Sequence, residues 1–133
     1  VKRRRESLER AMCPFCHFSP DQLRWADAHC LVIRDAFPVS PGHSLVIPRR
    51  HVGSFFELTA AERASVLTGL DAARRELDAV FAPAGYNIGI NDGPAAGQTV
   101  AHVHVHLIPR YEGDVDDPRG GVRWVIPDKA RYW

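Results

Sequence analysis

The sequence has no hydrophobic run long enough to cross a membrane, which excludes a transmembrane protein. It also has no large surplus of one charge, since 17 basic residues stand against 16 acidic ones. A dedicated nucleic-acid binder carries a basic surplus, so we expect no nucleic-acid partner. No apolar signal segment follows the basic N-terminus, which favours a cytoplasmic location.

Cysteine is scarce, and its odd number, three, argues against a disulfide framework in a chain of this kind. The 133 residues allow one domain. We expect a basic arm over residues 1–11 and a single domain over residues 12–133, with residues 111–133 as its C-terminal tail.

Short apolar segments bounded by turn residues predict strands, and a capping box at residues 59–62 predicts the start of a long helix. Pro83 and Gly85 end this helix. The expected strands cover residues 28–34, 43–47, 86–90 and 103–109. Four or five strands around one long helix indicate an α+β fold with an antiparallel sheet.

Histidine is the residue in surplus, with seven in the chain, and His102, His104 and His106 alternate with valines. On a strand this period directs the three imidazoles to one face, about 7 Å apart, and the valines to the other. Such a row suits three roles. The first is an exposed face that merely tolerates histidine, and the second is a metal site. The third is a catalytic site with an imidazole as nucleophile or base.

A glycine-rich segment precedes the histidine row and favours the catalytic interpretation. Gly93 and Gly97 let backbone amides approach an anion, and Gln98 and Thr99 add neutral donors. Anion-binding amides beside nucleophilic imidazoles indicate phosphoryl or nucleotidyl transfer.

These segments resemble the histidine triad (HIT) family, whose His-x-His-x-His signature lies in GQTVAHVHVHLIPR. The resemblance runs from about Cys13 to Arg110 and includes PGHSLVIPRRH at residues 41–51 and NDGPAAGQTV at residues 91–100. It is closer to the Fhit branch of dinucleoside polyphosphate hydrolases than to the Hint branch of nucleoside phosphoramidases. The family resemblance implies a HIT-like fold with a five-stranded antiparallel sheet, and a homodimer with one continuous sheet.

The resemblance also implies roles for the matching residues. His104 matches a nucleophile that attacks an α-phosphate and becomes a nucleotidyl-histidine, and His106 and His43 match histidines that contact the phosphate. Asp35 matches a residue that binds the ribose hydroxyls. The positions that match phosphate-contacting residues are Asn91, Gly97, Gln98, Thr99 and Val100. Those that match the apolar residues around the purine are Phe15, Phe18 and Ile33.

The implied activity is that of a nucleotide hydrolase or nucleotidyltransferase. It would cleave diadenosine polyphosphates or related adenylated compounds at the α-phosphate and release AMP without an organic cofactor. Four alternatives stay open. They are an adenosine 5′-phosphoramidase, a diadenosine polyphosphate phosphorylase, a non-catalytic nucleotide-binding module, and an enzyme that uses the three histidines as metal ligands.

The pair Cys13 and Cys16 permits four interpretations. The four are a c-type haem site completed by His17, a redox pair, two unligated thiols, and half of a zinc site. Some HIT proteins hold zinc with such a pair, a distant histidine and the first histidine of the triad. The resemblance therefore implies a structural zinc on Cys13, Cys16, His51 and His102.

Overall fold

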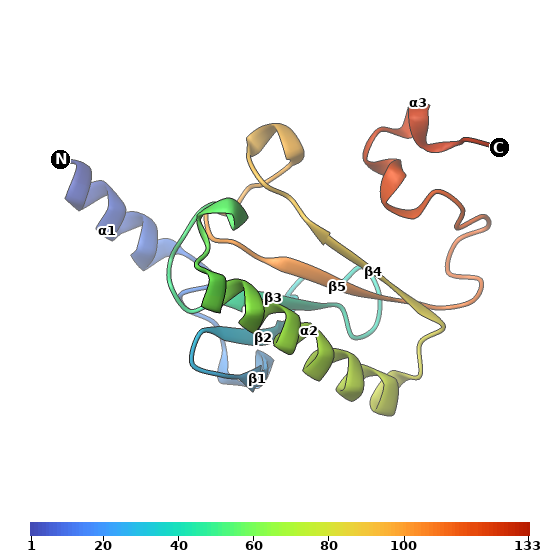
Figure 1. The fold of residues 1–133 in the computed structure, drawn as a ribbon, viewed down its shortest axis with the longest axis horizontal. Helices are drawn as coiled ribbons and strands as arrows, with labels where there is room; N and C mark the ends of the chain where they lie inside the picture. The colour runs from blue at the N-terminus through green and yellow to red at the C-terminus, as the bar shows by residue number, and fades with distance from the viewer.

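The computed structural model describes residues 1–133 and has the predicted α+β fold. Five antiparallel strands form one sheet in the order β1-β2-β3-β5-β4 (Figure 1). The strands are β1 (Leu23–Ala26), β2 (Cys30–Arg34), β3 (Ser44–Pro48), β4 (Gly85–Ile90) and β5 (Val105–Arg110). The helices are α1 (Lys2–Met12), the long α2 (Ala60–Phe81) and α3 (Pro127–Ala130).

The predicted capping box is confirmed at the start of α2. Thr59 accepts the backbone N–H of Glu62 at 3.1 Å, and the Glu62 carboxylate accepts the N–H of Thr59 at 2.9 Å. Gly69 lets α2 lie close against the sheet, because a Cβ there would stand 2.9 Å from Cγ1 of Val46. The helix therefore covers one face of the sheet, as Figure 1 shows.

The two faces of the sheet carry separate apolar clusters because side chains alternate along each strand. The cluster facing α2 includes Val32, Val46, Val105 and Leu107. The opposite face carries a smaller cluster, made of Leu31, Ile33, Leu45 and Ile47, with Phe15 and Phe18 packed on it. This second face is left free of α2 and holds the histidines described below.

Two strands differ from the prediction. β1 supplies the fifth strand, whose position the sequence did not indicate. Its residues are mostly exposed at the sheet edge, so they lack the alternation that marks a half-buried strand. β5 begins at Val105 because the N–H of Val103 donates to the carbonyl of Val52 at 2.8 Å, outside the strand ladder. Only one residue of the histidine row, His106, therefore lies within a strand.

The first helix, α1, is exposed along its length and projects from the rest of the chain (Figure 1). It covers most of the segment expected to be a basic arm. No helix in the structure combines the length and apolar character needed to cross a membrane.

Candidate functional site

The register of β3 and β5 brings two distant histidines together. Ser44 pairs with Leu107 and Leu45 pairs with His106, so His43, which directly precedes β3, comes to lie beside His106. Nε2 of His43 is 2.9 Å from Nδ1 of His106. The ring centres of His104 and His106 are 5.2 Å apart, less than the strand spacing predicts. Three imidazoles therefore meet on the face opposite α2.

The hydrogen bond of His104 determines which of its nitrogens can react. Its Nδ1 lies 2.8 Å from the carbonyl oxygen of His102, and a carbonyl can only accept. Nδ1 therefore carries the proton, and Nε2 keeps its lone pair. This is the tautomer that an imidazole nucleophile needs.

The protons of His43 and His106 follow from a chain of hydrogen bonds. The N–H of Val39 donates to Nδ1 of His43 at 3.1 Å, so neutral His43 carries its proton on Nε2 and donates it to Nδ1 of His106. His106 then presents its own N–H at Nε2. Burial lowers the pKa of both histidines below 6.5, which keeps them neutral at pH 7.

Asp35 lies beside the hydrogen-bonded pair of His43 and His106. Its Oδ2 is 3.5 Å from Nε2 of His43, and its Oδ1 accepts the N–H of Phe37 at 2.8 Å. Donor atoms of Asp35, His43 and His106 lie within 4.8 Å of one another, close enough to share a cation. The structure thus brings the predicted ribose-binding carboxylate to the edge of the histidine cluster.

The segment between β4 and the histidine row is a glycine-containing loop with backbone amides that have no partner in the protein. Asn91 directly follows Ile90, which pairs with Val105, the residue after His104. Gly93 and Gly97 have φ angles of +92° and +93°, which only glycine adopts readily. The backbone amides of the predicted phosphate residues Thr99 and Val100 donate to no group in the protein. They remain available to an anion.

Gln98 has a different role from the free donor expected of it. Its Oε1 accepts the N–H of Gly93 at 2.8 Å, and its Nε2 donates to the carbonyls of Gly53 and Val100 at 2.8 and 3.0 Å. Both hydrogens of the amide are used within the protein. The side chain therefore ties the loop together and anchors it to the segment around Gly53.

We expect Gln98→Ala to lower the free energy of unfolding by about 1–3 kcal/mol, because three backbone groups lose their partner. Thr99→Ala is the matched control, since Thr99 is exposed and its side chain makes no hydrogen bond. Chemical denaturation measures both variants. A loss for Gln98→Ala no larger than that of the control would contradict an anchoring role.

The three residues predicted to hold a purine lie together. Phe15 and Phe18 pack on the cluster that contains Ile33, on the same face as the histidines. The ring centre of Phe15 is 4.8 Å from that of His104. An apolar surface therefore adjoins the candidate nucleophile.

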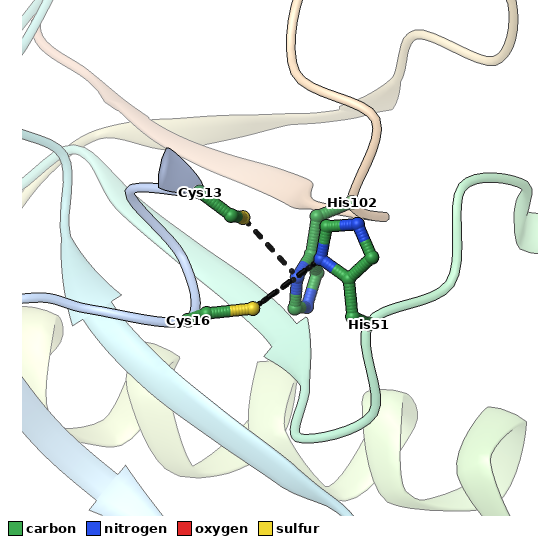
Figure 2. Close-up of side chains that lie close together, drawn as sticks. All are labelled: Cys13, Cys16, His51 and His102. Atoms are coloured by element: carbon green, nitrogen blue, oxygen red, sulfur yellow. Dashed lines mark hydrogen bonds between the residues drawn. The ribbon is translucent and has the colours of Figure 1, made fainter. Parts of the chain in front are cut away.

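The four predicted metal ligands converge at a second centre, drawn in Figure 2. Nδ1 of His102 lies 3.5 Å from Sγ of Cys13, 3.6 Å from Sγ of Cys16 and 3.3 Å from Nδ1 of His51. Nε2 of His102 donates to the carbonyl of Pro48 at 2.8 Å, so the lone pair of Nδ1 faces the thiols.

These separations fit a tetrahedral ion. Metal–nitrogen bonds of about 2.05 Å and metal–sulfur bonds of about 2.3 Å give tetrahedral edges of about 3.4 Å between nitrogens and about 3.6 Å between nitrogen and sulfur. The pair Cys16 and His51, at 3.3 Å, is also near this length. Burial raises the pKa of the Cys16 thiol to about 11, so a cation is needed to hold a thiolate there. The four residues could hold a metal ion.

The three histidines of the row do not form one ligand set. His102 faces the cysteines, whereas His106 bonds to His43 across the sheet, and the two groups of possible ligands share no residue. The groups that orient these rings are mainly backbone atoms of Val39, Pro48 and His102, for which the sequence carries no side-chain signal.

Asp92 has a role that the sequence did not indicate. It accepts the hydroxyl of Ser54 at 3.0 Å and the N–H of Phe55 at 2.7 Å, and so fastens the loop after β4.

Comparison with known proteins gives a consistent assignment. The HIT domain family matches residues 18–113. A bis(5′-nucleosyl)-tetraphosphatase of Schizosaccharomyces pombe is 45% identical over 80 residues, which are 60% of this chain and 44% of that protein. An AP-4-A phosphorylase of Mycobacterium tuberculosis is 38% identical over 85 residues, 63% of this chain and 44% of that protein. The matches thus span less than half the length of these relatives.

The fold is also similar to that of solved structures. A zinc-bound histidine triad family protein from Mycobacterium smegmatis superposes with a TM-score of 0.71 at 30% identity. The superposition covers 91% of this chain and 95% of that protein.

Proposed function

The chain belongs to the HIT family, and on this premise we propose that it cleaves diadenosine polyphosphates or related adenylated compounds at the α-phosphate and releases AMP. The observation that carries the proposal is the tautomer of His104, whose Nδ1 is held by the carbonyl of His102 while Nε2 is free to attack. The two relatives above, one a tetraphosphatase and one a phosphorylase, support this class of substrate.

In the first step, Nε2 of His104 attacks the α-phosphorus. The phosphorus–nitrogen bond forms while the bond to the bridging oxygen breaks, and that oxygen leaves with the electron pair. The negative charge on this oxygen would be stabilised by the N–H at Nε2 of His106, whose ring is held by the hydrogen bond from His43. Nδ1 of His104 keeps its proton, so the adenylylated ring is cationic and a good leaving group.

In the second step, water attacks the adenylylated His104 and loses a proton to solvent. The phosphorus–nitrogen bond breaks, its electron pair returns to Nε2, and AMP is released. Inorganic phosphate in place of water would give ADP, which is the phosphorylase reaction. The free amides of Thr99 and Val100 and the side chain of Asn91 would bind the non-bridging oxygens.

The nucleoside is proposed to bind on the side of β2 and β3. Phe15, Phe18 and Ile33 supply an apolar surface for adenine, and Asp35 supplies two oxygens for the ribose hydroxyls. The near-neutral charge of the chain does not oppose an anionic substrate, because amides and neutral imidazoles bind phosphate by hydrogen bonds.

We further propose that the ion at Cys13, Cys16, His51 and His102 is zinc. A bound zinc ion would cross-link these four ligands and would take no part in the reaction. The ligand chemistry, two thiols and two imidazoles, supports zinc over calcium or magnesium, which prefer oxygen.

A homodimer is part of the proposal. Strand β4 lies at the edge of the sheet and exposes Ile88 and Ile90, so a second copy can extend the sheet there. Light scattering tests this: a mass of 14.8 kDa, that of one chain, would contradict it.

A substrate panel tests the activity. We expect the protein to convert diadenosine tetraphosphate to AMP and ATP, with a kcat/KM above that for adenosine 5′-phosphoramidate. A higher value for the phosphoramidate would favour that alternative activity. Tight AMP binding without turnover of any substrate would contradict catalysis and favour a nucleotide-binding module.

A further inference from the structure

A cavity of about 610 Å³ lies on the histidine face of the sheet, between the strands and the C-terminal tail. Asn87 of β4 and Ile108 of β5 form its floor. Val115 and Trp124 of the tail, together with Val39 of the loop before β3, line part of its apolar wall.

The cavity adjoins the candidate phosphate-binding histidines. Ile108 follows His106 by two residues on the same face of β5, a step of about 7 Å. Val39, which lines the cavity, also donates its N–H to Nδ1 of His43. The sheet order puts the purine cluster over β2 and β3 and the cavity over β5 and β4. The histidines therefore lie between two separate binding surfaces.

The charges at the cavity are already paired. Arg110 donates to both carboxylate oxygens of Asp114, at 2.7 and 2.9 Å, and to Oδ1 of Asn87 at 2.7 Å. Asp117 is paired with Arg119 at 2.9 Å. No unpaired cation is among the lining residues, so the lining suits a neutral, planar group. Nδ2 of Asn87 makes no hydrogen bond within the protein and can donate to a ring nitrogen or carbonyl.

We propose that this cavity binds the nucleobase of the leaving nucleotide, so that the second nucleoside of a dinucleoside polyphosphate determines substrate choice. This inference rests on the proposed function, in which the leaving phosphates depart at the His43 and His106 end of the site. Trp124 supplies the aromatic wall for stacking, and Asn87 supplies the polar contact.

The test compares two substrates that share the transferred AMP and differ in the leaving group. Diadenosine tetraphosphate loses ATP, whereas adenosine 5′-phosphoramidate loses ammonia and cannot reach the cavity. Trp124→Ala is expected to lower kcat/KM for the tetraphosphate about 10-fold, as loss of base stacking does, and to change the phosphoramidate value less than about 2-fold.

Trp133→Ala is the matched control. Trp133 is a second tail tryptophan of similar exposure, 43% against 40% for Trp124, and it does not line the cavity. Val115→Trp, which fills the cavity from an exposed position, gives a second variant that does not remove tail contacts of Trp124. It should show the same selective loss.

The outcomes separate the two levels of inference. Wild-type protein without turnover of either substrate would overturn the proposed function itself. An active wild type, in which Trp124→Ala and Val115→Trp lower both kcat/KM values by the same factor or leave both unchanged, would overturn the nucleobase cavity alone. An equal loss in Trp133→Ala would also overturn it.

Discussion

His104→Ala is expected to lower kcat/KM for diadenosine tetraphosphate by about 10⁴-fold or more, because no other group can take the place of the attacking nitrogen. His106 cannot substitute, since its Nδ1 accepts the hydrogen bond from Nε2–H of His43 and its own Nε2 carries a proton. The carbonyl of His102 would lose its donor at the same time, but it lies next to a strand that other bonds hold in place.

The measurement is rapid quench with substrate labelled at the α-phosphate. The quench should be alkaline, since a phosphorus–nitrogen bond to histidine is labile in acid. Wild-type protein is expected to show label bound to the chain before free AMP reaches its steady rate. His104→Ala is expected to show no bound label at any time.

His29→Ala is the control, because His29 is exposed in the turn between β1 and β2 and its side chain contacts no part of the site. It should retain wild-type turnover and labelling. Bound label in His104→Ala would place the covalent intermediate on another residue and contradict the role of His104. Activity within about tenfold of the wild type without bound label would leave direct attack by water.

The sequence was sufficient to predict the parts of the fold that depend on local pattern. The Thr59–Glu62 capping box and the apolar strands appeared as expected, because their signals lie within a few residues. The edge strand β1 was missed because its exposed residues do not alternate. The start of β5 was placed too early because the bond from Val103 to Val52 joins segments far apart in the sequence.

The same distinction holds for the site. Spacing and family resemblance led to His43, His104 and His106, but not to the orientation of their rings. That orientation comes from backbone groups such as the N–H of Val39 and the carbonyl of His102, which every residue type provides. Gln98 shows the converse: a side chain expected to face phosphate has its hydrogen bonds inside the protein.

Removal of the metal is expected to have the second large effect, on stability. The four ligands come from segments up to 89 residues apart, so an ion there cross-links the Cys13 loop to the sheet. We expect one zinc per chain, and a fall in Tm of about 10 °C or more when Cys16→Ser removes a ligand. Elemental analysis and calorimetry measure the two quantities.

Cys30→Ala is the matched control, because Cys30 lies in the core facing α2 and offers no ligand to the ion. It should cost about 1 kcal/mol through lost packing and keep one zinc per chain. Wild-type protein that binds no zinc, or whose Tm is the same with and without a chelator, would contradict the metal site.

The time course of chelation distinguishes a structural ion from a catalytic one. His102 connects the two centres, since its ring faces the cysteines and its carbonyl holds Nδ1 of His104. Loss of the ion should therefore disturb His104 only as the surrounding segment loosens. We expect activity and near-ultraviolet circular dichroism to decay at the same rate after chelator is added. Immediate loss of activity with unchanged dichroism would instead assign the metal to the chemistry.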